Sequence, residues 1–223
     1  MISDLVTKFD IDTENELKNA LGKAFPDIGF YGEETGGTLN GTFWLVDPID
    51  GTQHFVRGLP FCSTMLALIK DGEPVFSVIN LFATQEVFVA EKGKGAVCND
   101  SALKVSSRPL IESFISFESN PSVVTNAEIR KSLKSKTWFL QTLNAGFEFA
   151  MVASGKLDGR IQLDPYGGVH DYAAGALLVR EAGGVVANIG SANYDFKNFN
   201  FLATNPVVYR ELTEGEGAIF ANG

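Results

Sequence analysis

The chain has 223 residues, of which 45% are hydrophobic and 20% charged, so it can bury a sizeable core and is not a disordered polypeptide. Its formal net charge of −9 repels the backbone of DNA and RNA, which argues against a nucleic-acid partner. The same charge repels phosphate esters, so a phosphatase of this composition requires cations at its site.

No apolar run approaches the ~20 residues that cross a bilayer, and the first residues lack the pattern of an export signal. The two cysteines, Cys62 and Cys98, form no CxxC pair. Such a chain suits a reducing compartment. We therefore expect a cytoplasmic protein with no membrane partner.

The first half of the chain is predicted to be a helix followed by an antiparallel meander. Residues 10–24 have helical periodicity. The predicted apolar face of this helix comprises Leu17, Ala20, Leu21 and Ala24. The strand-like segments that follow are 43–46, 63–70, 73–80 and 86–91. Asp71-Gly72, between the second and third of these, is a strong hairpin signal.

The second half alternates between strand-like and helix-like segments. Predicted strands are 114–118, 137–140 and 201–204, and predicted helices are 126–135, 144–154 and 171–182. Asn205-Pro206 begins a further helix. This alternation indicates an α/β half. We place the boundary near residues 104–110, which divides the chain into residues 1–106 and 107–223.

The segment Asp47-Pro-Ile-Asp-Gly-Thr52 follows a predicted buried strand and brings two carboxylates close together. Asp47 and Asp50 repel each other unless a proton or a cation neutralises them. Hard oxygen ligands suit Mg²⁺. The amides of Gly51 and Thr52, if they open a helical turn, form a phosphate site. The alternative is a surface turn, because Asp, Pro and Gly are common in turns.

Two further acidic positions have simpler explanations when each is taken alone. Glu33 and Glu34 are typical of a solvated surface, and Asp171 can serve as the cap of the helix that follows His170. The run Ala173-Ala-Gly-Ala176 in that helix indicates that another element packs very close to it.

Other catalytic classes lack their motifs. The sequence contains no GxSxG, no GxxxxGK[ST] and no cysteine followed six residues later by arginine. Two histidines and two scattered cysteines argue against zinc. The loop after Asp47 lacks the closing glutamate of a calcium-binding EF-hand.

Taken together, these segments resemble the inositol monophosphatase family of Mg²⁺-dependent, lithium-sensitive phosphatases. The matching motifs are Asp4-Leu-Val-Thr7, Asp10, Gly32-Glu-Glu34, residues 44–52, Gly93-Lys-Gly-Ala96, Asp171-Tyr-Ala-Ala-Gly175 and Glu181-Ala-Gly-Gly184. They extend over nearly the whole chain. The resemblance implies a five-layer α-β-α-β-α sandwich of the α/β class that lacks its first helix. It also implies hydrolysis of a small phosphate monoester by a metal-activated water.

The resemblance further implies a set of metal ligands. Glu33, Asp47 and the Ile49 carbonyl would hold a first Mg²⁺. Asp47 would bridge to a second ion, which Asp50 and Asp171 would bind. Two or three Mg²⁺ ions per site are expected.

By the same resemblance, Thr52 paired with Asp10 would orient or deprotonate the attacking water, and Glu33 would help to hold it. The phosphate and substrate contacts would come from Asp50, Gly51, Thr52 and Asp164. We expect inositol-1-phosphate or a related sugar or polyol phosphate as the substrate, and a homodimer.

Several alternatives remain open. Histidinol phosphate and fructose 1,6-bisphosphate are substrates in the wider superfamily, and a catalytically inactive member could act as a binding protein. The chain begins almost at the first family motif, and we expect it to be a shortened member. His170 stands where the family more often has Trp, and residues 143–146 read Leu-Asn-Ala-Gly rather than Gly-Ser-Ala.

Overall fold

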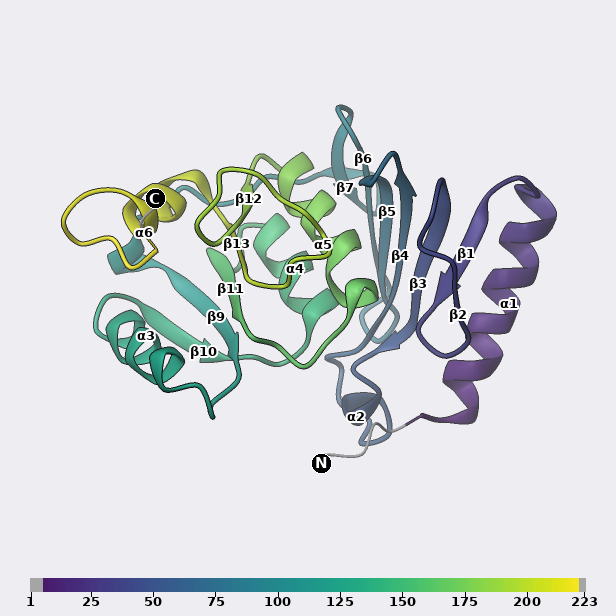
Figure 1. Ribbon diagram of the computed structural model, residues 1–223, viewed down its shortest axis with the longest axis horizontal. Helices are drawn as coiled ribbons and strands as arrows, with labels where there is room; N and C mark the ends of the chain where they lie inside the picture. The colour runs from purple at the N-terminus through teal and green to yellow at the C-terminus, as the bar shows by residue number, and fades with distance from the viewer. Residues whose placement is uncertain (1–5, 221–223) are drawn as a thin grey trace.

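The computed structural model describes residues 6–220, which form two β-sheets and six α-helices. The two sheets and the helices other than the single turn α2 stack in five layers (Figure 1). Helix α1 (Lys8–Ala24) covers the outer face of the larger sheet. Helices α4 (Ala145–Ala153) and α5 (Val169–Glu181) lie between the sheets, and α3 (Val124–Lys134) and α6 (Pro206–Thr213) cover the smaller sheet. The predicted α-β-α-β-α sandwich is confirmed. Asp4 and Leu5, from the first family motif, lie outside the described residues.

The larger sheet has eight strands in the order β2-β1-β3-β4-β5-β6-β7-β8. Its strands are β1 (Gly29–Gly32), β2 (Gly36–Gly37), β3 (Phe43–Asp50), β4 (Ser63–Lys70), β5 (Glu73–Leu81), β6 (Glu86–Glu91), β7 (Gly95–Cys98) and β8 (Ser101–Ala102). From β3 to β8 all pairs are antiparallel, so the predicted meander is confirmed, whereas β1 runs parallel to β3. Every residue of β3 is buried because α1 and α5 cover its two faces.

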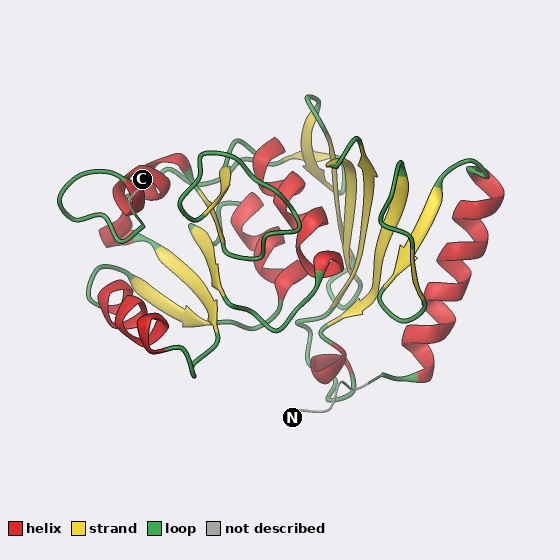
Figure 2. Ribbon diagram, in the orientation of Figure 1, coloured by secondary structure: helices red, strands yellow, loops and turns green. Residues whose placement is uncertain are grey.

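The smaller sheet has five strands in the order β10-β9-β11-β13-β12. Figure 2 shows helices on both sides of this sheet. Its strands are β9 (Phe114–Ser119), β10 (Trp138–Gln141), β11 (Gly159–Leu163), β12 (Val185–Asn188) and β13 (Phe201–Thr204). Strand β9 pairs in parallel with β10 and β11, and β13 is antiparallel to β11 and β12. A 3₁₀ turn, η1 (Leu110–Glu112), precedes β9.

The central helices pack at close range, as the small residues of α5 predict. A Cβ atom on Gly175 would overlap the ring of Phe149 in α4. Glycine at this position therefore allows α5 to approach α4, which places the N-terminus of α5 beside the end of β3. No helix within residues 6–220 is long and apolar enough to cross a membrane.

The predicted inner face of α1 is only partly correct. The buried side chains of the helix are the carboxylates of Asp10 and Glu14, whereas Ala20 and Ala24 are exposed. Glu14 is buried because its carboxylate accepts hydrogen bonds from the amides of Glu34 and Thr35, each at 2.9 Å. Amphipathic periodicity did not predict that Glu14 is buried, because it assigns only apolar residues to the inner face of a helix. A carboxylate can nevertheless be buried there when two backbone amides donate hydrogen bonds to it. Leu17 and Leu21 are half-buried on the same side.

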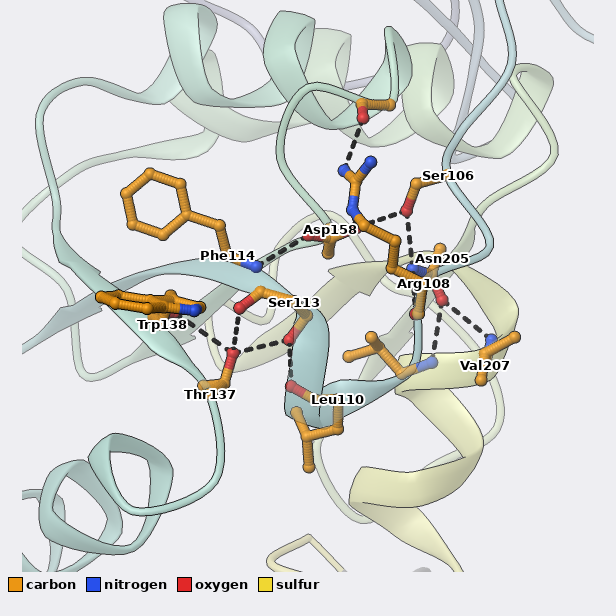
Figure 3. Close-up of polar contacts among 12 residues, drawn as sticks. Ser106, Arg108, Leu110, Ser113, Phe114, Thr137, Trp138, Asp158, Asn205 and Val207 are labelled. Atoms are coloured by element: carbon orange, nitrogen blue, oxygen red, sulfur yellow. Dashed lines mark hydrogen bonds and ion pairs between the residues drawn. The ribbon is translucent and has the colours of Figure 1, made fainter.

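The segment that joins the two sheets is tied to the smaller one (Figure 3). The buried carboxylate of Asp158 accepts hydrogen bonds from the Ser106 hydroxyl and from the amide of Phe114 at 2.7 Å, and it pairs with Arg108 at 2.8 Å. The Asn205 amide group donates to the Ser106 hydroxyl at 2.8 Å and to the Arg108 carbonyl at 3.1 Å. The division at residues 106 and 107 stays a prediction, but this network fixes the crossing segment.

Candidate metal and phosphate site

A cavity of about 600 Å³ lies where the end of β3 meets the N-termini of α4 and α5. Six carboxyl side chains line it: those of Glu33, Glu34, Asp47, Asp50, Glu118 and Asp171. None of the described residues that line it is Lys or Arg. The negative charge predicted for the site is therefore concentrated in one cavity.

Three of these carboxylates converge on one point. Asp47, Asp50 and Asp171 each offer an oxygen within 4.8 Å of the oxygens of the other two. Asp47 and Asp50 are at the end of β3, where a bulge shifts its register against β4. Asp171 is in the first turn of α5, and its Oδ2 accepts a hydrogen bond from the Gly168 amide at 2.5 Å. The structure thus brings these three predicted ligands together.

The electrostatics of the cluster require a neutralising partner. Asp47 and Asp50 are 1% and 3% exposed, and burial raises the pKa of each carboxyl well above its usual range. The neighbouring carboxylates raise both pKa values further, Asp50 acting most strongly on Asp47 and Asp171 on Asp50. Buried like charges at this spacing need protons or a cation.

One carboxylate oxygen of Asp47 has no protein donor among the described residues. Its Oδ1 is buried and has no hydrogen-bond partner within residues 6–220. A buried carboxylate oxygen is normally satisfied. The donors around it are oxygen atoms, which Mg²⁺ prefers. The residues present therefore fit this ion.

Glu33 and Ile49 lie at the edge of the cluster. The Glu33 amide donates to the Val46 carbonyl at 3.0 Å, which holds the residue beside β3. Burial raises the pKa of Glu33, and the nearby His170 lowers it. The Ile49 carbonyl accepts a hydrogen bond from the Thr52 hydroxyl at 3.0 Å.

Asp50 is held by groups that sequence reasoning did not identify. Its Oδ2 accepts hydrogen bonds from the Ser63 hydroxyl at 2.9 Å and from the Gly146 amide at 2.7 Å. Asn144, the N-cap of α4, donates to the Asp50 carbonyl at 2.8 Å and to the Phe61 carbonyl at 2.7 Å. Asn144 was predicted only as a helix start, and a long-range contact of this kind leaves no local signal.

Gly51 and Thr52 connect β3 to the single turn α2 (Thr52–Phe55). Gly51 has a φ of 84°, and a Cβ atom there would overlap the Asn144 amide group. The Thr52 hydroxyl lies 3.0 Å from Oδ1 of Asp10, a fully buried residue. The structure thus joins the predicted pair of Thr52 and Asp10.

Asp164 is not among the residues that line the cavity, and its role as a substrate contact stays a prediction. Its backbone has a φ of 47°, and its carboxylate accepts hydrogen bonds from the side chains of Asn126 at 3.1 Å and Asn200 at 3.4 Å. The left-handed backbone conformation and these contacts fix the exposed side chain in the loop between β11 and α5.

A buried ion network, which the sequence did not suggest, supports the wall of the cavity. Arg160 is fully buried and pairs with the carboxylates of Glu148 and Glu118. Glu118 lines the cavity, and burial raises its pKa although Arg160 acts in the opposite direction. The hydroxyl of Tyr172, also in the wall, is buried without a partner in the described part of the chain.

Comparison with known proteins identifies the family. A sequence model of the inositol monophosphatase family matches residues 2–219. Inositol monophosphatase 2 of Solanum lycopersicum is 32% identical over 218 residues, which cover 92% of this chain and 82% of that protein. Histidinol-phosphatase of Mycobacterium tuberculosis is 35% identical over 194 residues, which cover 82% and 74%.

The fold comparison agrees with the sequence comparison. The crystal structure of extragenic suppressor protein suhB from Bartonella henselae superposes with a TM-score of 0.85 at 33% identity, covering 93% of this chain and 82% of that one. The resemblance inferred from the motifs is confirmed: the chain belongs to the inositol monophosphatase family.

Proposed function

We propose that this protein hydrolyses small phosphate monoesters in a Mg²⁺-dependent reaction. The proposal rests on Asp47, Asp50 and Asp171, which each offer an oxygen within 4.8 Å of those of the other two, and on the buried Oδ1 of Asp47, which has no hydrogen-bond partner within residues 6–220. The family membership supports the same reaction.

In this proposal, Mg²⁺ is held by Asp47 and Asp50 from β3 and by Asp171 from α5. Glu33 and the Ile49 carbonyl complete the donor set, for two or three ions in all. When bound, the ions neutralise the carboxylates and the phosphate and lower the pKa of a coordinated water. The residues themselves supply a fixed set of oxygens, because the Gly168 amide and the Ser63 hydroxyl hold Asp171 and Asp50 in place.

Thr52 and Asp10 are proposed to accept the proton that the attacking water loses. The Thr52 hydroxyl has one proton and two acceptors at 3.0 Å, Asp10 Oδ1 and the Ile49 carbonyl. When it donates to Asp10, an oxygen lone pair is available to accept the proton of the water. The water oxygen forms the new bond to phosphorus while its proton passes through the Thr52 hydroxyl to Asp10. The bond from phosphorus to the ester oxygen breaks, and the departing alkoxide takes a proton from solvent, so the products are orthophosphate and the alcohol.

The amides of Gly51 and Thr52 are proposed to hold the phosphate, and Asp50 would contribute as a ligand of the metal beside it. Positive φ at Gly51 turns the chain sharply into α2. Backbone N–H groups at such a turn favour an anion. Asp164, in the loop between β11 and α5, is proposed as a contact to the alcohol part of the substrate.

The lining of the cavity favours a monophosphate of a polyol or sugar, such as inositol-1-phosphate. Fructose 1,6-bisphosphate carries a second phosphate, and the described lining residues offer no Lys or Arg to neutralise it. Histidinol phosphate is the second candidate. Its ammonium group would face the Glu118 carboxylate, which is 17% exposed in the wall, and one relative is named for this reaction.

We further propose a cytoplasmic homodimer. Ile111, Phe114 and Trp138 are 71%, 41% and 74% exposed, and Trp138 lies directly opposite Phe114 in the sheet. Clustered exposed apolar side chains are typical of protein interfaces. Sedimentation equilibrium of the protein and of Trp138→Lys tests this: the native chain should sediment as a dimer and the variant as a monomer.

The test of the activity is phosphate release from inositol-1-phosphate, histidinol phosphate and fructose 1,6-bisphosphate, with Mg²⁺ and with EDTA. We expect metal-dependent release from the monophosphates. Failure to release phosphate from any of the three esters would favour the alternative of an inactive family member that acts as a binding protein.

A further inference from the structure

The hydroxyl of Tyr172 is a buried polar group in the wall of the cavity, and the proposed reaction does not use it. Tyr172 follows Asp171 in α5, lines the cavity and is 1% exposed. Its hydroxyl oxygen has no hydrogen-bond partner among residues 6–220. A phenol can both donate and accept hydrogen bonds, and a buried group of this kind is normally paired. The hydroxyl is therefore a candidate contact for a bound molecule.

Packing fixes the ring of Tyr172. Its centroid lies 5.5 Å from the ring centroid of Phe199 and 5.7 Å from that of Phe201, both in edge-to-face geometry. At the hydroxyl end, a Cβ atom on Gly167 would stand 2.1 Å from the phenol oxygen. Glycine at position 167 thus allows the loop before α5 to pass close beside the hydroxyl.

Glu118 supplies a carboxylate near this hydroxyl. It is in β9, lines the same cavity, and its side chain is 17% exposed. Burial raises the pKa of Tyr172, and Glu118 is the neighbouring charge that raises it most. The phenol does not donate to Glu118, because its hydroxyl has no partner in the described part of the chain. A polar group between the two side chains can therefore bond to both.

Arg160 holds the Glu118 carboxylate in place. Its fully buried guanidinium donates to Oε2 of Glu118, and also to Oε1 of Gln162 at 2.8 Å. A carboxylate has acceptor sites on both of its oxygens. Glu118 can therefore accept a further hydrogen bond from a molecule in the cavity while Arg160 keeps it fixed.

We propose that Glu118 and Tyr172 form a specificity subsite that binds a hydroxyl group on the alcohol part of the phosphate ester. This inference rests on the proposed function of the same cavity. An alcohol hydroxyl can accept a hydrogen bond from the phenol and donate one to the carboxylate, whereas an ammonium group donates only and leaves the phenol proton without an acceptor. A site built to pair with a substrate hydroxyl rejects the analogue that lacks it. The subsite thus selects polyol and sugar phosphates.

The test compares two ligands that cannot be hydrolysed, the phosphonate analogues of inositol-1-phosphate and of cyclohexyl phosphate, which has the same ring without hydroxyls. Titration calorimetry with Mg²⁺ gives the Kd of each. The native protein should bind the inositol analogue at least about tenfold more tightly, and Tyr172→Phe should reduce this preference about tenfold, the value of one hydrogen bond. Tyr194→Phe is the matched control and should keep the native preference, because the Tyr194 hydroxyl is also buried and unpartnered in the described chain but does not line the cavity.

An undiminished preference in Tyr172→Phe, or no preference in the native protein, would overturn the subsite. An equal loss of affinity for the phosphonate analogue of histidinol phosphate would overturn the choice of a hydroxyl over an ammonium group. Tyr172→Phe should unfold at the native temperature or above it, because it removes an unpaired buried hydroxyl.

A second set of ligands keeps the test decisive if Tyr172→Phe does not fold. Among analogues of the inositol phosphonate that each lack one hydroxyl, at least one should bind the native protein about tenfold more weakly, and equal binding of all of them would refute the subsite. Hydrolysis of inositol-1-phosphate is assayed separately. Hydrolysis without the selective loss of binding refutes the subsite alone, and the selective loss without hydrolysis refutes the proposed function alone.

Discussion

The hydroxyl of Thr52 lies 3.0 Å from Oδ1 of Asp10, although the two residues are 42 positions apart in the chain. The other oxygen of Asp10 accepts a hydrogen bond from the Thr7 amide at 2.8 Å, which caps α1. One buried carboxylate thus joins the start of the outer helix to the turn that follows β3. Asp10 therefore has a structural role and a proposed catalytic role. A substitution that preserves the shape of the side chain can test the catalytic role.

Asp10→Asn keeps the size of the side chain but removes the carboxylate that would take up the Thr52 proton. We expect kcat to fall by about 10²–10⁴-fold, the usual contribution of general base catalysis, with Mg²⁺ affinity changed less than about threefold. Steady-state kinetics and metal titration calorimetry measure the two effects. Glu14→Gln is the control, because Glu14 is a buried carboxylate on the same helix that bonds to backbone amides instead of Thr52. Equal losses of kcat in both variants would contradict the assigned role.

Asp47→Asn removes one charge from a buried cluster of like charges. In EDTA we expect the variant to be more stable than the native protein, on the order of 1–3 kcal/mol, because an unneutralised buried charge is costly. Mg²⁺ at about 100 times its Kd should stabilise the native protein by about 2.7 kcal/mol and leave the variant unchanged.

Thermal unfolding with EDTA and with Mg²⁺ measures both effects of Asp47→Asn. Asp27→Asn, which changes an exposed carboxylate outside the cavity, is the control and should behave like the native protein. An equal Mg²⁺ response in Asp47→Asn and the native protein would show that Asp47 is not a metal ligand.

Gly51→Ala should disturb the turn that carries the proposed phosphate site. The added methyl group would overlap the Asn144 amide, and alanine is strained at a φ of 84°. We expect a loss of about 1–3 kcal/mol in unfolding free energy and a large fall in kcat/KM. Gly58→Ala is the matched control: Gly58 also has positive φ, 66°, but a Cβ atom there meets open space. If both variants lose activity equally, the close approach of Asn144 is not important.

Arg160→Met should destabilise the protein because the carboxylates that pair with Arg160 lose their cation. The change leaves the fully buried Glu148 carboxylate without its cation, and we expect a loss of about 3–5 kcal/mol in urea unfolding. Lys156→Met is the control, since Lys156 pairs with Glu86 at 3.5 Å on the exposed surface and such pairs contribute about 1 kcal/mol or less. A similar cost for both changes would refute the importance of the buried network.

Local signals in the sequence predicted much of the fold. The β4 and β6 bounds match the predicted segments because alternation and the Asp71-Gly72 turn depend on neighbouring residues only. Strand β11 was missed because Arg160 and Gln162 interrupt its apolar pattern. Both side chains are fully buried. Burial of Arg160 is possible because Glu148 and Glu118, which belong to other elements, pair with its guanidinium group.

For the site, the sequence by itself determined that Asp47 and Asp50 lie close together, because a three-residue separation across a turn leaves them little freedom. The family motifs added Asp171 and Glu33. Only the tertiary structure decided that Asp164 bonds to Asn126 and Asn200 and that His170 lies near the carboxylates of Glu33 and Asp171. Both outcomes depend on how the loop between β11 and α5 packs against distant strands, and packing of this kind leaves no periodic or local trace in the sequence.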